Sequence, residues 1–291
     1  MRTIISVILF TVIFSTTVYA NSKDIQELGA KGYVLVLDTQ FDEANKIFDE
    51  IIKLEPDNAL GYFLKALSYE FELTIGNSGK ELEKKYITMS LEAADIAKKM
   101  LKKNKGNTDA RFYLACVYGD LGLYYGATGR FLRAWWYGRK AEPNMKKVIE
   151  KDPEYYDAYL GVGLYEYLLY VLPKRVKILS FLIGDNDGDR EKGIEHITLA
   201  SQKGSYTRDR AKFFLADWVY FSFEDNDEEA LALFKELAAK YPNNLFFKMR
   251  IAKCCLNLSM YDHAIQTINN TLQAESLNRF PGIQTLLYRY L

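Results

Sequence analysis

Residues 245–272, LFFKMRIAKCCLNLSMYDHAIQTINNTL, contain the pattern that decides the fold of this chain. Ile251 and Ala252 stand in the first half, Ala264 and Ile268 stand in the second half, and Tyr261 lies at the turn between them. Small residues at the two alanine positions allow two helices to cross closely, and the larger neighbours fill the space beside the crossing. The segment therefore predicts a pair of antiparallel helices.

The same arrangement recurs along the chain. In residues 25–58 the small residues are Gly32 and Ala44, and the bulky ones are Leu28, Leu35 and Phe48, with Lys31 as a departure. Further first helices contain Tyr62, Ala66 and Tyr69; Leu114, Ala115 and Tyr118; Tyr159, Val162 and Gly163; and Leu215 and Ala216. Their second helices contain Ala93, Ala97 and Met100; Ala141, Met145 and Val148; Gly193, Ile197 and Ala200; and Ala230, Phe234 and Leu237. Pro56, Pro153 and Pro242 each close a unit, which favours a true repeat over chance.

These units resemble the tetratricopeptide repeat, whose helix pairs span about 34 residues. The resemblance covers nearly all of residues 21–291 and implies one all-α domain, a right-handed superhelical solenoid of about six helix pairs. The chain departs from the repeat between the two helices of units two, three and four, where we expect longer connections. The inserts are similar to those of exported bacterial repeat proteins. Residues 280–291, with Pro281 at a helix start, are expected to form a capping helix.

The N-terminus predicts export. Arg2 precedes an apolar run from Ile4 to Phe14, and Val18-Tyr19-Ala20 fits a signal-peptidase site. We expect residues 1–20 to be a signal peptide that is cleaved after Ala20, which would leave a periplasmic or secreted protein. Retention as an uncleaved anchor is the alternative, although the run is short for a membrane span.

The first helices of such repeats line the concave face of the superhelix, so their outward positions form the candidate partner-binding groove. These positions hold Tyr33, Phe63, Phe112, Tyr167, Arg210, Phe213, Asp217, Tyr220, Phe221, Phe246, Met249, Lys253 and Asn257. An aromatic lining with sparse charges suits a peptide or protein partner. The alternative is that inserted segments fill the groove and make these aromatic residues part of the core. Trp218 is expected on another face, packed against the paired helix.

No pattern predicts catalysis, a metal or a cofactor. The two histidines, His196 and His263, fall in different units, and the loop from Asp185 to Asp189 fails the calcium-loop spacing. Asp187 or Asp189 is expected instead to cap the following helix. Cys116, Cys254 and Cys255 read as small buried residues. Glu166 takes a usually apolar position, so it either faces a ligand or stays in water while Tyr165 or Tyr167 turns inward.

The charge is balanced overall, with 38 basic and 38 acidic residues, which argues against nucleic acid as a partner. It is uneven along the chain, because residues 98–177 are net basic and residues 185–240 are net acidic. The apolar insert 168–184 includes Lys174, Arg175, Lys177 and Phe181, and suits either a lid over the groove or peripheral membrane contact. Taken together, the sequence predicts a non-enzymatic scaffold of the cell envelope that binds a protein or peptide. A binding protein for an envelope glycan or lipid is the first alternative, and an enzyme with an unrecognised site is the second.

Overall fold

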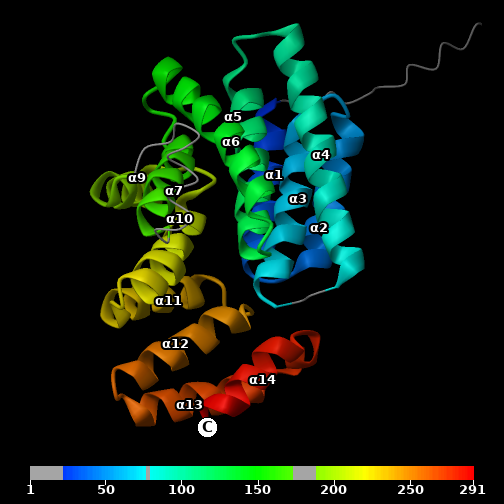
Figure 1. Ribbon diagram of the computed structural model, residues 1–291. Helices are drawn as coiled ribbons and strands as arrows, with labels where there is room; N and C mark the ends of the chain where they lie inside the picture. The colour runs from blue at the N-terminus through cyan, green and yellow to red at the C-terminus, as the bar shows by residue number, and fades with distance from the viewer. Residues whose placement is uncertain (1–21, 77–78, 173–187) are drawn as a thin grey trace, which may run out of the picture.

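The computed structural model describes residues 22–76, 79–172 and 188–291, and every regular element in these ranges is a helix (Figure 1). The predicted signal peptide, residues 1–20, lies outside them. The first three helix pairs are α1 (Ser22–Leu37) with α2 (Phe41–Leu54), α3 (Ala59–Thr74) with α4 (Lys80–Lys103), and α5 (Thr108–Ala127) with α6 (Phe131–Lys151). The next three are α7 (Asp157–Val171) with α9 (Arg190–Lys203), α10 (Arg208–Phe214) and its π-helical continuation η1 (Leu215–Phe223) with α11 (Asp227–Lys240), and α12 (Leu245–Asn257) with α13 (Tyr261–Leu272). A short 3-10 turn, η2 (Glu275–Arg279), leads to the predicted capping helix α14 (Pro281–Tyr290). The fold is therefore the expected all-α solenoid of repeated helix pairs.

Tight turns join the helices of the first, third and sixth pairs. The turns after α1, α5 and α12 each place one residue in the left-handed region, with φ values of 61° at Thr39, 74° at Gly129 and 58° at Ser259. The expectation of a long connection is wrong for the third unit, because only residues 128–130 separate α5 from α6. The additional residues of that unit lengthen the helices instead, to 20 residues in α5 and 21 in α6.

The second and sixth units begin with a capped helix. Pro56 and Pro242 follow the ends of α2 and α11, and two residues later Asn58 and Asn244 start the next helix. The Asn58 side chain accepts a hydrogen bond from the amide of Leu60, and the Asn244 side chain accepts from Phe246 and Phe247. These bonds satisfy amide groups that a helix start leaves without a partner.

The small residues of the repeat lie where the paired helices touch. A Cβ atom at Gly32 would stand 2.5 Å from the Phe48 ring, so α1 and α2 could not pack as they do with a larger residue there. In the fourth unit a Cβ at Gly163 would stand 2.7 Å from the carbonyl oxygen of Gly193. Backbone-to-backbone proximity of this kind requires glycine, as the sequence pattern predicted.

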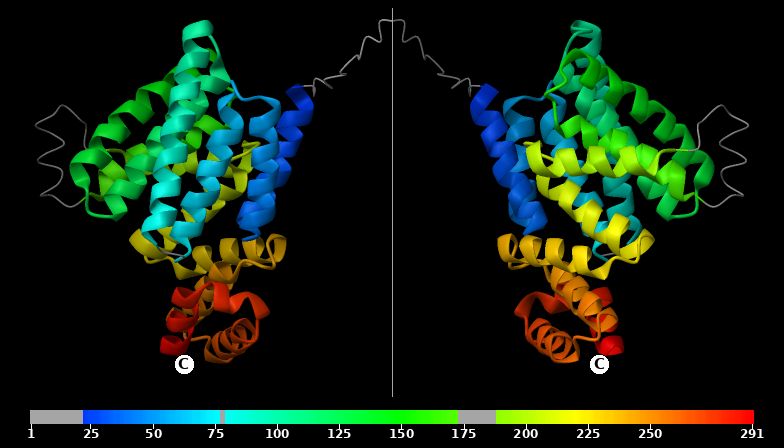
Figure 2. Two further views of the ribbon diagram at one scale, coloured as in Figure 1. Left: turned by 90° about the vertical axis from the view of Figure 1, so that its right-hand side faces the viewer. Right: turned by 90° about the vertical axis from the view of Figure 1, so that its left-hand side faces the viewer.

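The superhelix closes on itself, so that the last units touch the first. The Asn244 amide donates to the carbonyl of Leu37 at 2.7 Å, and the Asn243 backbone amide donates to the Asp38 carboxylate at 2.9 Å. The Tyr206 hydroxyl donates to the carbonyl of Gln26 at 3.0 Å. Figure 2 shows the result, with the yellow-to-gold part of the chain, above the orange and red helices, lying at the lower ends of the blue N-terminal helices.

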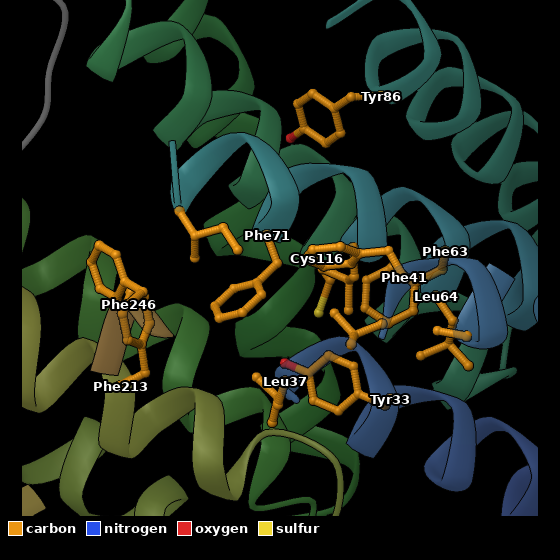
Figure 3. Packing of buried hydrophobic residues seen from close by; sticks show 14 of the residues in the cluster. Tyr33, Leu37, Phe41, Phe63, Leu64, Phe71, Tyr86, Cys116, Phe213 and Phe246 are labelled. Atoms are coloured by element: carbon orange, nitrogen blue, oxygen red, sulfur yellow. The ribbon is translucent and has the colours of Figure 1, made fainter. Parts of the chain in front are cut away.

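Closure brings the first helices of distant units into one core. Figure 3 shows Tyr33 and Leu37 of α1, Phe71 of α3 and Phe213 of α10 pointing toward the same region. The Phe71 and Phe213 rings meet edge to face, with centroids 5.8 Å apart. Aromatic pairs of this geometry add to the stabilisation from burial. The concave face is therefore filled by side chains from opposite units over this part of its length.

Candidate functional site

Most of the side chains predicted to line an open groove are buried. They are Tyr33, Phe63, Phe112, Tyr167, Arg210, Phe213, Asp217 and Phe246, each at most 8% exposed, together with Met249. We therefore revise the picture of an open aromatic groove along all the first helices. Neighbouring and opposing repeat units both contribute to this burial, because the Phe63 ring stacks on Tyr113 of the next unit at 5.5 Å between centroids and the Phe213 ring meets Phe71 of an opposing unit at 5.8 Å. Trp218 is only half-buried and contacts the Phe214 ring edge to face, at 5.2 Å between centroids.

An ionic cluster occupies the centre of the closed superhelix. The Arg210 guanidinium makes two hydrogen bonds to the Asp120 carboxylate, at 2.6 Å and 3.3 Å, and lies 3.5 Å from a carboxylate oxygen of Glu70. Each of the three side chains is at most 16% exposed. The cluster joins α3, α5 and α10, because each of these helices supplies one of its charges.

Burial changes how the groups of this cluster hold protons. Loss of solvation raises the pKa of Glu70 to about 7, because the lowering effect of Arg210 is smaller and Asp120 adds a like charge. Burial also raises the pKa of Tyr33, whose ring packs beside the cluster. The cluster is paired and enclosed, so we interpret it as an element that fixes the packing of the helices.

Four predicted groove residues, on η1 and α12, remain accessible. Tyr220 on η1 and Lys253 on α12 are half-buried, and Asn257 at the end of α12 is exposed. We call these three, with the half-buried Phe221, the η1–α12 surface. The Asn257 amide donates to both carboxylate oxygens of Asp227 at 3.0 Å, which holds the end of α12 to the start of α11.

A charged residue of α12 supports this surface from within. The Arg250 guanidinium lies 2.6 Å from the Asp217 carboxylate and 4.6 Å from the centroid of the Phe221 ring. Burial raises the pKa of Asp217, while Arg250 acts in the opposite direction. The Phe221 ring is thus held between the π-helix and α12, and a cationic group packs against its face.

The other single residues considered from sequence have structural partners. Glu166 is half-buried and lies 2.9 Å from Nδ1 of His196, while Tyr167 turns fully inward. Asp189 caps α9 as predicted, accepting from the amide of Lys192 at 3.1 Å. The insert residues Lys174, Arg175, Lys177 and Phe181, and Asp185 with Asp187, fall outside the described residues. Within the described ranges, no group of three or more His, Cys, Asp or Glu side chains is placed to hold a metal ion.

Sequence reasoning overlooked a second accessible surface, on the first half of α6. We define the α6 surface as Phe131, Leu132, Arg133, Trp135, Trp136, Arg139 and Lys140. Leu132 is 83% exposed and Phe131 58% exposed, and both tryptophans also contact solvent. The available signal was the stretch 121–141, which interleaves large apolar residues with basic ones and contains no Asp or Glu.

The repeated helix pairs give this chain the architecture of a tetratricopeptide-repeat solenoid. Three solved structures illustrate the likeness. The thermophilic repeat protein TTC0263 of Thermus thermophilus is 18% identical, with a TM-score of 0.48 over 80% of this chain and 98% of that one. MamA is 17% identical (TM-score 0.42, 67% and 94% covered), and yeast Tom70 is 13% identical (TM-score 0.42, 92% and 69% covered). At these identities the likeness concerns the fold alone.

No protein-family model matches the sequence, and no curated protein matches it either. Among the described helices, none has the length and apolar character needed to cross a membrane.

Proposed function

We propose that this chain is a non-enzymatic scaffold of the cell envelope that binds a partner protein on its η1–α12 surface. The observation that supports the proposal is the accessibility of Tyr220, Lys253 and Asn257, whereas most of the other predicted groove residues are buried. Repeat solenoids present rigid surfaces that need little reorganisation on binding, which favours recognition of proteins. Export to the envelope rests on the signal-peptide pattern of residues 1–20.

The surface offers chemistry suited to an extended segment of a protein. The Tyr220 ring and the Phe221 ring supply rigid apolar area, and Lys253 supplies a positive charge beside the Tyr290 ring, 5.7 Å from its centroid. Aromatic anchors with few charges around them are typical of the residues that dominate binding energy in protein interfaces. An acidic or neutral segment fits this surface better than a basic one.

Site-specific crosslinking tests the proposal. A photo-crosslinking residue at position 257 should capture a protein in envelope extracts, whereas the same residue at the exposed position Asp262, on α13, should not. Capture should fall at least about tenfold in a Tyr220→Ala, Lys253→Glu variant, since each anchor contributes about 1–3 kcal/mol in a typical interface. An adduct that persists in this variant would contradict the proposed surface.

Location is tested separately. N-terminal sequencing of the exported protein should begin at Asn21, and recovery of the intact precursor in the membrane fraction would favour the anchor. A glycan or lipid ligand for the η1–α12 surface would be indicated if purified envelope glycans or lipids, rather than proteins, blocked crosslinking at position 257.

A further inference from the structure

The first half of α6 carries its large apolar side chains on the outside of the molecule. Phe131, Trp135 and Arg139 form one row along the helix, and Leu132, Trp136 and Lys140 form the row beside it, since residues four apart share a face. Trp136 is 47% exposed. A helix of a repeat solenoid usually turns such residues toward its partner helix, so their outward position requires an explanation.

The inner side of α6 shows why these residues point outward. A Cβ atom at Gly122 of α5 would lie 3.3 Å from the carbonyl oxygen of Ala134 and 3.4 Å from the amide nitrogen of Gly138. Small residues on both helices therefore bring the two backbones close together. The Tyr137 ring fills the remaining contact by stacking on Tyr125, with centroids 5.6 Å apart. The interface with α5 is complete without the two tryptophans, which are left on the surface.

Basic groups lie among the exposed aromatic rings. The Lys140 ammonium lies 3.2 Å from the centroid of the Trp136 ring, and the Arg139 guanidinium lies 5.8 Å from that of Trp135. Arg133, also exposed, lies 5.4 Å from the centroid of the Tyr125 ring. No acidic residue occurs between Asp120 and Glu142 in the sequence, so the charges that this stretch of α6 itself contributes are all basic.

We infer that the α6 surface docks on the headgroup region of an anionic lipid bilayer, with Leu132 and Phe131 entering the interface. Tryptophan favours this region because its ring is apolar and its N–H can meet polar groups, and Arg and Lys extend their charges to lipid phosphates. The inference goes beyond the proposed protein-binding function and concerns a different part of the molecule.

The shape of the surface favours a bilayer over a peptide. Peptide recognition needs a groove or an exposed sheet edge, and here the apolar side chains project outward from a helix. Two cavities of the described fold, about 320 Å³ and 900 Å³ in volume, are lined by residues outside the α6 surface. A deformable lipid interface can accept projecting side chains without a matching pocket.

Vesicle binding tests the inference directly with the full chain. Each basic residue near an anionic bilayer strengthens binding about fivefold, so Arg133 and Lys140 together should make binding to vesicles of phosphatidylcholine with phosphatidylglycerol about 25-fold tighter than binding to phosphatidylcholine alone. Tryptophan fluorescence should shift to shorter wavelength on binding and become protected from aqueous iodide. Trp218 is half-buried and lies outside the α6 surface, so its share of the fluorescence should not change when vesicles bind.

A matched pair of variants assigns the binding to α6. Leu132→Glu should weaken binding to anionic vesicles about tenfold or more without lowering thermal stability, because the Leu132 side chain is 83% exposed. Tyr261→Glu changes a similarly exposed apolar residue on α13, 59% exposed, and should leave binding unchanged. A variant Arg133→Glu, Lys140→Glu should reduce the preference for anionic vesicles.

Three outcomes would overturn the inference. They are equal binding to neutral and anionic vesicles, unchanged binding by Leu132→Glu, and equal losses in Leu132→Glu and Tyr261→Glu. If the chain instead bound soluble polyglutamate through the α6 surface and ignored vesicles, an acidic protein would replace the bilayer as its partner. None of these results bears on crosslinking at position 257, so the two proposals fail independently.

Discussion

Glu70 makes the stability of this protein depend on pH in a direction opposite to that of an ordinary ion-paired carboxylate. Its oxygen lies 3.5 Å from the Arg210 guanidinium, whereas Asp120 takes the closer position at 2.6 Å. The Arg210 charge is therefore largely matched by Asp120. The second carboxylate is 16% exposed and sits beside a like charge, so its ionised form is disfavoured in the folded state.

The sign and the size of the effect follow from the pKa. Folding raises the pKa of Glu70 from 4.5 to about 7, so between these values the folded state holds more protons than the unfolded state. Stability is then greatest below pH 4.5 with respect to this group, and declines as pH rises toward 7. A shift of this size corresponds to roughly 3 kcal/mol across the window.

The variant Glu70→Gln removes this titration while keeping the volume of the side chain. The free energy of unfolding, measured by urea denaturation with circular dichroism from about pH 4 to about pH 8.5, should favour the variant increasingly as pH rises, by up to about 3 kcal/mol. Taking the difference between the two proteins removes the titration of all other groups. Glu50→Gln, which changes an exposed carboxylate on α2, serves as the matched control.

The reasoning is refuted if the difference between Glu70→Gln and the unaltered chain stays flat across this range. It is also refuted if the variant is less stable at every pH, because that would mean that Glu70 is ionised and that its attraction to Arg210 outweighs the cost of burial. Either result would require a more solvated centre of the superhelix than the described side chains indicate.

Five further substitutions test the packing, each measured by thermal or urea unfolding. Gly193→Ala should cost about 1–3 kcal/mol because its Cβ would stand 2.7 Å from the Cβ of Tyr167, whereas Gly119→Ala, with 3.8 Å to its nearest neighbour, should stabilise by about 0.5–1 kcal/mol. Phe213→Ala should lower the free energy of unfolding by about 3–5 kcal/mol, which is more than Trp218→Ala should lower it. The reverse order would support the interpretation that Phe213 lines an open groove. Asn244→Ala should cost about 2 kcal/mol, since it removes a helix cap and a contact that closes the superhelix; a neutral result would show that closure does not depend on it.

The repeat could be predicted from sequence because its determinants are local. Gly32 and Ala44 are small because the two helices of one pair cross at these positions. Pro56 stands just after the helix that it ends, so its effect is also local. The same holds for the cap at Asp189, which requires only the helix that follows. Patterns that depend only on residues nearby in the chain can be interpreted without the tertiary structure.

The candidate sites were harder to predict, because position in a repeat does not determine exposure. Phe213 and Lys253 both occupy first-helix positions that line a groove in an open solenoid, yet one is buried and the other is half-buried. The α6 surface was overlooked for the same reason. A helix rich in Trp and Phe is usually expected to bury them, and only the close approach of Gly122 to Ala134 shows that these rings stay outside.

The amino-acid sequence by itself determined the helices, their pairing and the order of the units, since each follows from residue spacing within about 34 positions. Only the tertiary structure decided that the superhelix closes, because closure depends on contacts such as Asn244 with Leu37, which are 207 residues apart. The small rotation between successive units accumulates along a solenoid, and slight differences at each interface decide whether its ends meet. The accumulated rotation brings Arg210 of α10 within reach of Asp120 and Glu70, which come from α5 and α3.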